Sequence, residues 1–266
     1  MDRQKIEKRL VVAACVFALA TLSGFSAAQT KNEKSGADTR ATAHAPTARQ
    51  ETAATKHVNA AATVVQRMDR EPRMKELLQE AKGVFIIPTY GRAALAVGGS
   101  GGAGVLLVKR DDDTWSDPAF YNTGGISVGA QAGVEGGPIA MILNNEKAVD
   151  RFMQKNSFSL NADAGLTVVN WAKTAESSVG RGDVTVWAGT KGLFGNVVTV
   201  GVNDIRFNQN LTNAYYHQTV SAEDVVNGKF NNPQADTLKR MLAASSPGKA
   251  GSSSGGGSAG TSSGKQ

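Results

Sequence analysis

Leu95–Asn145, the most informative stretch for the architecture, reads LAVGGSGGAGVLLVKRDDDTWSDPAFYNTGGISVGAQAGVEGGPIAMILNN. Two glycine-dense runs, residues 98–104 and 124–137, alternate with short runs of β-prone residues. Glycine weakens a strand, so its repeated use indicates bulges, sharp bends or the close approach of another backbone. Polar breaks at residues 109–113 and 144–145 separate the runs. The stretch therefore predicts strongly bent antiparallel strands that curl toward a barrel.

Residues 1–28 have the pattern of a secretory signal. Four cations precede an almost wholly apolar run over residues 10–25, and Ser26 to Ala28 supply the small residues of a cleavage site. The apolar run is shorter than the ~20 residues that cross a bilayer comfortably. We therefore expect export, with cleavage after Ala28.

Cys15, the one cysteine of the chain, offers a second interpretation of this segment. Residues 12–15 read VAAC, which matches a bacterial lipobox in letters, and lipidation of Cys15 would make a lipoprotein. The apolar run before Cys15 is shorter than the ~7–15 residues of a signal core, and the apolar character continues beyond it. Simple export is therefore favoured. Cleavage after Ala28 would leave a chain with no disulfide and no thiol chemistry.

Composition divides the rest of the chain into three segments. Residues 29–55 are rich in Ala, Thr and Lys without apolar periodicity, which is typical of a disordered linker, and residues 245–266 form a flexible Gly/Ser-rich tail. Residues 56–244 suffice for one domain. Without residues 1–28 the chain keeps 25 Lys/Arg and 21 Asp/Glu, a net charge of +4. This charge suits an anionic membrane surface, whereas export argues against nucleic acid as the partner.

Helical patterns open and close this domain. Apolar residues recur at helical spacing over 58–68 and over 74–81, and Pro72 separates the two runs. The further elements that we expect are strands over 84–87, 158–170, 183–188 and 196–207, a helix over 146–155 capped by Asn145, and helices after Ser221 and over 233–243. The fold class is therefore α+β, with a glycine-rich, strongly bent, barrel-like antiparallel sheet flanked by N- and C-terminal helices.

Cations gather in and after the first pair of predicted helices. They are Arg67, Arg70, Arg73, Lys75 and Lys82. The simpler interpretation is a solvated helix surface. The sharper one is a patch for anionic lipid headgroups, where each Lys or Arg contributes about 1 kcal/mol.

A second candidate membrane contact is the loop KGLFG, residues 191–195. It places Leu193 and Phe194 between glycines, beside Lys191. The two apolar side chains either pack into the core or enter a bilayer at the loop tip.

Enzyme motifs occur in letters but without their usual context. Residues 99–104 match G-x-G-x-x-G, yet strand-like sequence follows where a dinucleotide site needs a helix. Residues 98–102 and 125–129 match G-x-S-x-G, which needs a strand–turn–helix setting to form a nucleophile elbow. A secreted serine hydrolase using Ser127 and His217 is the remaining enzymatic hypothesis, although His217 fits a surface or capping residue better.

Two shorter motifs carry little information. The acidic run 111–113 lacks the ligand set of a tight calcium loop and reads as a solvated hairpin. Residues 181–183 read Arg-Gly-Asp, a cell-adhesion tripeptide. We therefore predict no metal site, no cofactor and no catalytic residues.

Eight ordered segments resemble the SYLF lipid-binding domain family. They are AKGVFIIP (81–88), GGSGGAGVLL (98–107), WSDPAFY (115–121), GGISVGAQAG (124–133), NNEKAVDRF (144–152), NADAG (161–165), KGLFGNV (191–197) and NAYYHQTVSAEDVV (213–226). The match covers about residues 56–243 and has the arrangement of the secreted bacterial branch, with no SH3 domain. Eukaryotic members are known for binding phosphoinositides, and some for binding and bundling actin. The resemblance implies phospholipid binding without catalysis.

These observations lead to one favoured function and two further alternatives. We expect an exported, non-enzymatic protein, periplasmic or associated with the outer membrane, that binds anionic phospholipid through the cations above and through Lys191, Leu193 and Phe194. The first alternative is a structural or stress-related envelope protein that binds another protein. The second is an outer-membrane barrel, against which the low aromatic content argues.

Overall fold

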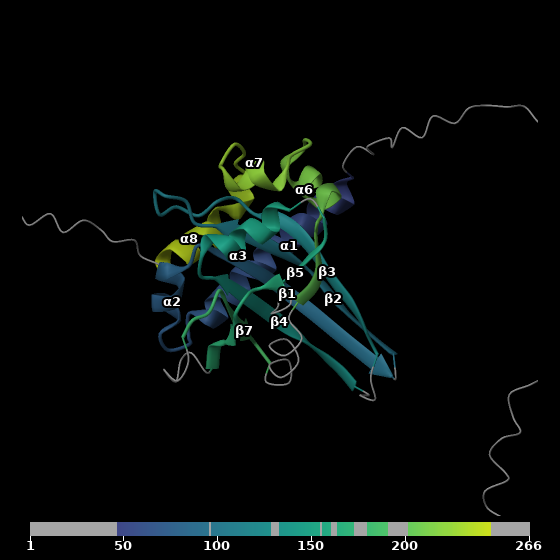
Figure 1. Ribbon diagram of the computed structural model, residues 1–266. Helices are drawn as coiled ribbons and strands as arrows, with labels where there is room; N and C mark the ends of the chain where they lie inside the picture. The colour runs from purple at the N-terminus through teal and green to yellow at the C-terminus, as the bar shows by residue number, and fades with distance from the viewer. Residues whose placement is uncertain are drawn as a thin grey trace, which may run out of the picture. The chain divides into compact units, whose positions relative to one another are not determined.

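Eight strands form a single sheet at the centre of the fold (Figure 1). The computed structural model describes residues 47–95, 97–128, 133–154, 156–160, 164–172, 180–190 and 202–245. The strands are β1 (Gly83–Leu95), β2 (Val97–Val108), β3 (Ala119–Val128), β4 (Gly133–Leu143), β5 (Phe158–Leu160), β6 (Val168–Asn170), β7 (Val184–Ala188) and β8 (Val202–Phe207). Their order is β5-β8-β3-β2-β1-β4-β7-β6. The sheet curls into a nearly closed barrel, which confirms the predicted α+β fold and bent sheet.

The edges of the sheet differ from the sequence prediction in two ways. Residues 158–170 are predicted as one strand, but Phe158–Leu160 form β5 and Val168–Asn170 form β6. These two short strands lie at opposite ends of the strand order. The predicted sheet is antiparallel throughout, but β6 pairs with β7 in parallel, with Val168 opposite Val184. Strand pairing is set by contacts between distant segments, so local sequence patterns did not reveal either feature.

Glycines in β2 allow β1 to approach closely. A Cβ atom at Gly102 would lie 2.6 Å from the carbonyl oxygen of Thr89, and one at Gly104 would lie 2.7 Å from that of Ile86. Both distances are shorter than any side chain tolerates. Between Ile86 and Gly91 the register of β1 against β2 shifts, which marks a bulge containing Pro88. The glycines and the bulge together give these strands the sharp bend that the sequence predicts.

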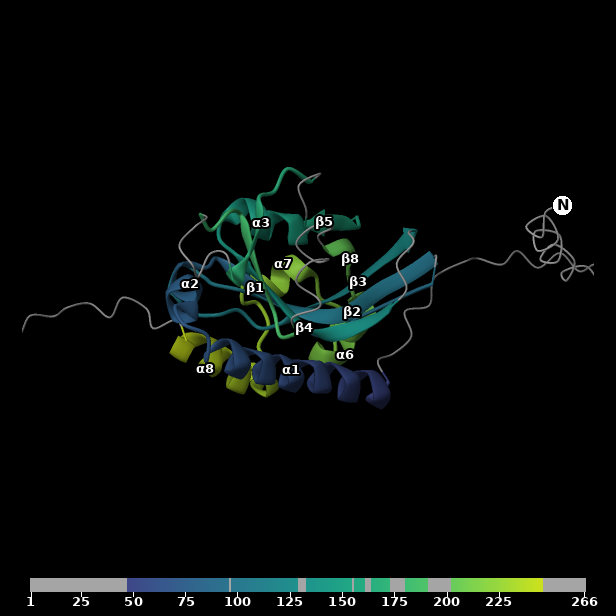
Figure 2. The same ribbon diagram turned by 90° about the horizontal axis from the view of Figure 1, so that it is seen from below.

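Helices cover both faces of the sheet. They are α1 (Ala48–Met68), α2 (Met74–Glu80), α3 (Glu146–Asp150), α6 (Gln209–Tyr216), α7 (Ala222–Val226) and α8 (Asp236–Ser245), with short 3-10 turns η3 (Arg151–Met153) and η5 (Pro233–Ala235). Figure 2 shows α1, α6 and α8 along one face, and α3 with β5 on the other. The Asn145 side chain accepts a hydrogen bond from the Ala148 N–H, which confirms the predicted cap of α3. Within the described ranges, none of the helices combines the length and apolar character that a bilayer-spanning segment needs.

Helix α1 begins earlier than its sequence pattern predicts. Residues 48–55, assigned to a linker from composition, form its first turns. The helix starts with a capping box, in which the Thr47 hydroxyl accepts from the Gln50 N–H at 3.3 Å and the Gln50 side chain accepts from the Thr47 N–H at 2.9 Å. Ala54 is fully buried, so a small residue continues the core-facing stripe where larger apolar residues are missing. Ser245, assigned to the Gly/Ser tail, is buried and ends α8. The predicted signal, Cys15 and residues 246–266 of the tail lie outside the described residues and stay predictions.

An aromatic cluster fills the space between β1, β3 and the α3–η3 segment. Tyr121 makes edge-on contacts with Phe85, Phe152 and Phe207, with ring centroids 6.0, 5.1 and 5.4 Å away. Its hydroxyl donates to the Phe152 carbonyl oxygen at 2.6 Å. Burial raises the pKa of Tyr121, so this donor stays protonated. The cluster ties η3 to the sheet.

A buried carboxylate joins the start of β3 to the C-terminal helices. Asp117 accepts from the Asn232 backbone N–H at 3.0 Å and pairs with Lys239 of α8 at 3.0 Å. Its side chain is 2% exposed, and that of Lys239 is 19% exposed. The Tyr216 hydroxyl donates to the Pro118 carbonyl oxygen at 2.9 Å beside this pair. These bonds hold α6 and α8 against the sheet.

We expect Gly104→Ala to destabilise the protein by about 2–3 kcal/mol, because the new methyl group has no room beside Ile86 and Phe85. Gly99→Ala is the matched control, since a Cβ there meets no atom within 4 Å. Its effect should stay within about 0.5 kcal/mol. Urea unfolding followed by circular dichroism measures both values, and equal stability of the two variants would contradict the close-packing argument.

We expect Asp117→Ala to cost about 3 kcal/mol of unfolding free energy, because it leaves the half-buried Lys239 ammonium and the Asn232 N–H without their buried acceptor. Asp236→Ala removes the second, more exposed partner of Lys239 and should cost less than about 1 kcal/mol. The same urea titration distinguishes the two. A smaller loss for Asp117→Ala than for Asp236→Ala would show that the buried pair is not what anchors α8.

Candidate functional site

Five cations lie at and after the connection between α1 and α2. Arg67, Arg70, Arg73, Lys75 and Lys82 are all exposed, and we call this set the basic turn. Met68 and Met74 flank the connection and are fully buried, so both ends of the turn are anchored in the core. Arg73 adopts a left-handed conformation, with φ of 61°, immediately before α2. The arrangement holds the cations on the outside of the connection and of the two helix ends beside it.

The members of the basic turn differ in their partners. Arg73 pairs with Glu76 at 3.2 Å, and Lys82 pairs with Glu146 at the start of α3 at 3.0 Å. Over the described part of the chain, Arg67, Arg70 and Lys75 have no carboxylate within ion-pair distance. Four carboxylates, those of Asp69, Glu71, Glu76 and Glu80, interleave with the five cations in sequence. The local excess of positive charge is therefore small and rests on the three unpaired side chains.

The apolar face of α1 packs against the core of the protein. Val58, Ala61, Val65 and Met68 are buried at 1% exposure or less, and the helix packs on β1, β2, α6 and α8. Beyond Ala48 its exposed residues are polar, with Lys56 the cation nearest its middle. An external surface therefore meets charged and polar side chains of α1, not its apolar stripe. The other predicted contacts, Lys191, Leu193 and Phe194, lie outside the described residues.

The enzyme motifs lack the local structure that their chemistry requires. Ser127 lies inside β3 opposite Gly98, and Ser100 lies inside β2 opposite Gly125, so neither stands at a strand–turn–helix elbow. The G-x-G-x-x-G run lies within β2, so it opens no helix. His217 ends α6 in a left-handed conformation, and its Nε2 lies 3.5 Å from the Glu51 carboxylate on the surface. It is the capping residue that the sequence favoured.

The Arg-Gly-Asp tripeptide is structural. The Asp183 carboxylate accepts from the Thr167 N–H and from the Asn145 side-chain amide, each at 2.6 Å, while Arg181 pairs with Glu80. The backbone hydrogen bond from Thr167, followed by that from Asn145, lowers the pKa of Asp183. The acidic side chain is thus occupied in joining β7 to α3. Among the described residues, no group of three or more His, Cys, Asp or Glu side chains could hold a metal ion.

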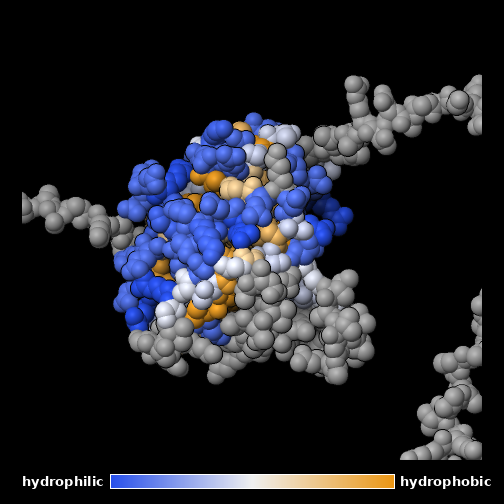
Figure 3. All heavy atoms as spheres, in the orientation of Figure 1, coloured by the Kyte–Doolittle hydropathy of each residue, from blue (hydrophilic) through white to orange (hydrophobic). Residues whose placement is uncertain are grey.

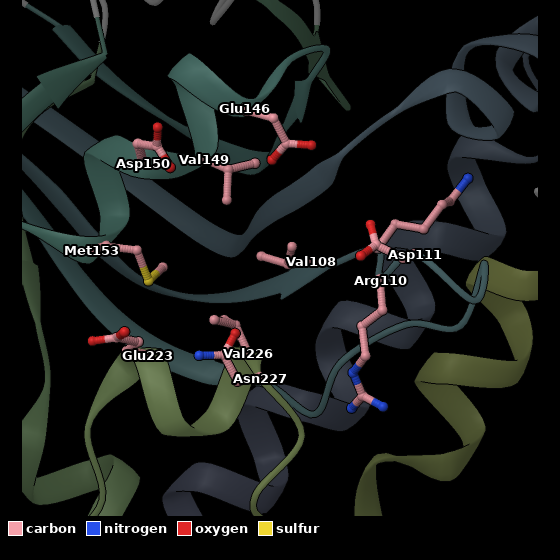
Figure 4. A pocket seen from close by; sticks show the side chains of 11 residues that line it. Val108, Arg110, Asp111, Glu146, Val149, Asp150, Met153, Glu223, Val226 and Asn227 are labelled. Carbon is pink, nitrogen blue, oxygen red and sulfur yellow. The ribbon is translucent and has the colours of Figure 1, made fainter.

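Two cavities open on the surface near the 109–117 connection. The first, of about 540 Å³, lies between α3, α7 and the end of β2 (Figure 4). The second, of about 450 Å³, lies between Trp115, Phe230 and α8. Sequence reasoning missed both, because their walls come from segments far apart in the chain. In Figure 3 a strip of apolar residues shows between α3 and α7, bordered by hydrophilic ones.

Residues 124–245 match the family model described as "Ysc84: Las17-binding protein actin regulator". Over these residues the chain is similar to the Ysc84 family. The matched residues include the second half of β3 and the whole of β4, α3, α6, α7 and α8, whereas Phe85, Asp117 and Tyr121 precede them. No solved structure matches the chain.

Proteins of fungi and animals are similar to this chain over about 170 residues. An SH3 domain-containing protein of Schizosaccharomyces pombe is 31% identical over 172 residues, covering 62% of this chain and 40% of the relative. Protein YSC84 of Saccharomyces cerevisiae is 28% identical over 172 residues, covering 62% and 36%. SH3 domain-containing YSC84-like protein 1 of Bos taurus is 26% identical over 170 residues, covering 62% and 49%. The chain thus spans less than half the length of these relatives.

We expect Asp183→Asn to flatten the loss of stability in acid. Because its folded-state pKa is depressed, Asp183 stabilises the fold above its unfolded pKa of about 3.9, and this contribution is lost as pH falls through the folded-state value. The melting temperature, measured between about pH 7 and pH 2, should therefore differ most between wild type and variant near neutrality. The difference should shrink in acid. A difference that is constant with pH would contradict the assignment.

Proposed function

We propose that this protein associates with anionic phospholipid at the cell envelope, without catalysing a reaction, and that the basic turn makes the contact. The observation that carries the proposal is the group Arg67, Arg70 and Lys75, which is exposed, lies at the anchored connection between α1 and α2, and has no carboxylate partner in the described ranges. Guanidinium and ammonium groups that keep no internal partner can bind phosphate oxygens directly.

The attachment is peripheral and electrostatic. Each cation near an anionic surface contributes about 1 kcal/mol, so three of them give a reversible contact. The apolar stripe of α1 stays in the core, so binding does not require the helix to unfold from the sheet. Salt weakens such a contact, because it screens exposed charges over a Debye length of ~10 Å at 0.1 M. Export of the chain, with or without lipidation at Cys15, would bring it to this surface.

A second candidate function is the binding of another protein. The family model is described as a Las17-binding protein, and two Saccharomyces cerevisiae relatives are named LAS seventeen-binding protein 3. The names of similar proteins therefore point to a protein partner. The cavity between α3 and α7 supports this candidate, because it exposes apolar residues bordered by hydrophilic ones on one surface of the protein (Figure 3).

We expect Arg67→Ala, Arg70→Ala and Lys75→Ala together to lower vesicle binding by about a hundredfold, at ~1 kcal/mol for each cation. The assay is co-sedimentation of the full-length chain with phosphatidylcholine vesicles that contain or lack phosphatidylglycerol, at low and high salt. Wild-type binding should need the anionic lipid and should fall as salt rises.

The matched control replaces three exposed cations elsewhere, Arg49, Lys56 and Arg206, and changes the net charge equally. It should weaken binding no more than a few-fold. An equal loss in both triple variants would show that net charge, not the basic turn, governs binding. Absence of binding to every anionic composition at low salt would overturn the lipid proposal and favour the protein-binding candidate.

A further inference from the structure

The cavity between α3 and α7 has an apolar floor. Val149 and Val226 are at most 8% exposed, and Val108 and Met153 are partly exposed beside them. In Figure 4 these four side chains converge on the middle of the cavity from β2, α3, η3 and α7. The volume of about 540 Å³ is in the range of ~300–1,000 Å³ that holds small ligands and single anchoring side chains.

Carboxylates line the rim of this floor. Asp111, Glu146, Asp150 and Glu223 stand around it on three separate segments, and all four are exposed (Figure 4). Glu146 is paired with Lys82. In the described part of the chain no cation lies within ion-pair distance of Asp111, Asp150 or Glu223. Three negative charges therefore face solvent around an apolar centre.

The two cations of the cavity wall are directed elsewhere. The Lys109 ammonium donates to the carbonyl oxygens of Leu78 and Gln79 at the end of α2, at 3.0 and 2.7 Å. The Arg110 guanidinium packs against Gly228, where an added Cβ would lie 2.8 Å from its central carbon. Its Nε is buried, and Figure 4 shows the side chain running away from the floor. Neither cation neutralises the rim.

We propose that this cavity is a docking groove for a short basic segment of a partner protein, one that places an apolar side chain on the floor and Lys or Arg on the rim. The argument is charge complementarity. Apolar side chains gain from burial at the centre, while flanking cations meet the three unpaired carboxylates. An anionic lipid headgroup is disfavoured by the same carboxylates, since like charges repel.

The groove and the basic turn are separate sites that adjoin at one ion pair. Lys82 belongs to the basic turn and Glu146 to the groove rim, and their side chains meet at 3.0 Å. The groove does not depend on the lipid proposal. Met153→Ser, which leaves the charge of the groove unaltered, should leave vesicle binding unchanged, and the variants of the basic turn should not weaken peptide binding.

The test uses the full-length chain and a fluorescent hexapeptide of sequence KRLLKR, with binding followed by anisotropy. KRLLKR should bind saturably at one site, and KRGGKR, which has the same charge without apolar side chains, should bind at least about tenfold more weakly. The combined variant Asp150→Asn and Glu223→Gln should weaken KRLLKR about tenfold. Met153→Ser, which changes only the floor, should weaken it about fivefold.

The control variant Glu71→Gln with Asp204→Asn removes two carboxylates outside the groove and should leave KRLLKR binding unchanged. Circular dichroism melting confirms that each variant folds. Equal binding of KRLLKR and KRGGKR would reveal a charge-only surface and overturn the proposal. Unchanged binding by both the rim variant and Met153→Ser would likewise overturn it.

Discussion

The fold depends on how closely β1 can approach β2. At Gly102 and Gly104 the space that a Cβ would occupy is taken by carbonyl oxygens of β1 and by the side chains of Ile87 and Phe85. Between Ile86 and Gly91, beside these glycines, β1 has one residue more than β2 and accommodates it in a bulge. This packing bends the central strands and curls the sheet, so that the aromatic cluster around Tyr121 is enclosed and helices can cover both faces.

The second constraint is the buried carboxylate of Asp117. It links the segment before β3 with Asn232 and with Lys239 of α8, more than a hundred residues away in the chain. A buried charge is tolerated because it is paired and hydrogen-bonded. Through α8, which contacts both α1 and α2, it also supports the connection that carries the basic turn. A surface site of exposed cations thus relies on an interior ion pair for its position.

The two proposed sites carry exposed charges of opposite sign. The basic turn offers Arg67, Arg70 and Lys75, and the groove rim offers Asp111, Asp150 and Glu223. An anionic surface attracts the first group and repels the second, so lipid would contact the basic turn and not the groove rim. Lipid association and peptide docking would then be compatible in one molecule.

The fold class, the glycine-driven bend and the capped start of α3 could be predicted from the amino-acid sequence, because each depends on residues close together in the chain. The sequence also located the exposed cations and showed that the enzyme motifs lacked their context. Three features emerged from the fold alone: the parallel pairing of β6 with β7, the helical state of residues 48–55 and the internal hydrogen bonds of the Asp183 carboxylate. The groove between α3 and α7 likewise exists only in three dimensions. Strand partners, burial of small residues and cavity walls arise from contacts between distant segments, which leave no periodic signal in any one of them.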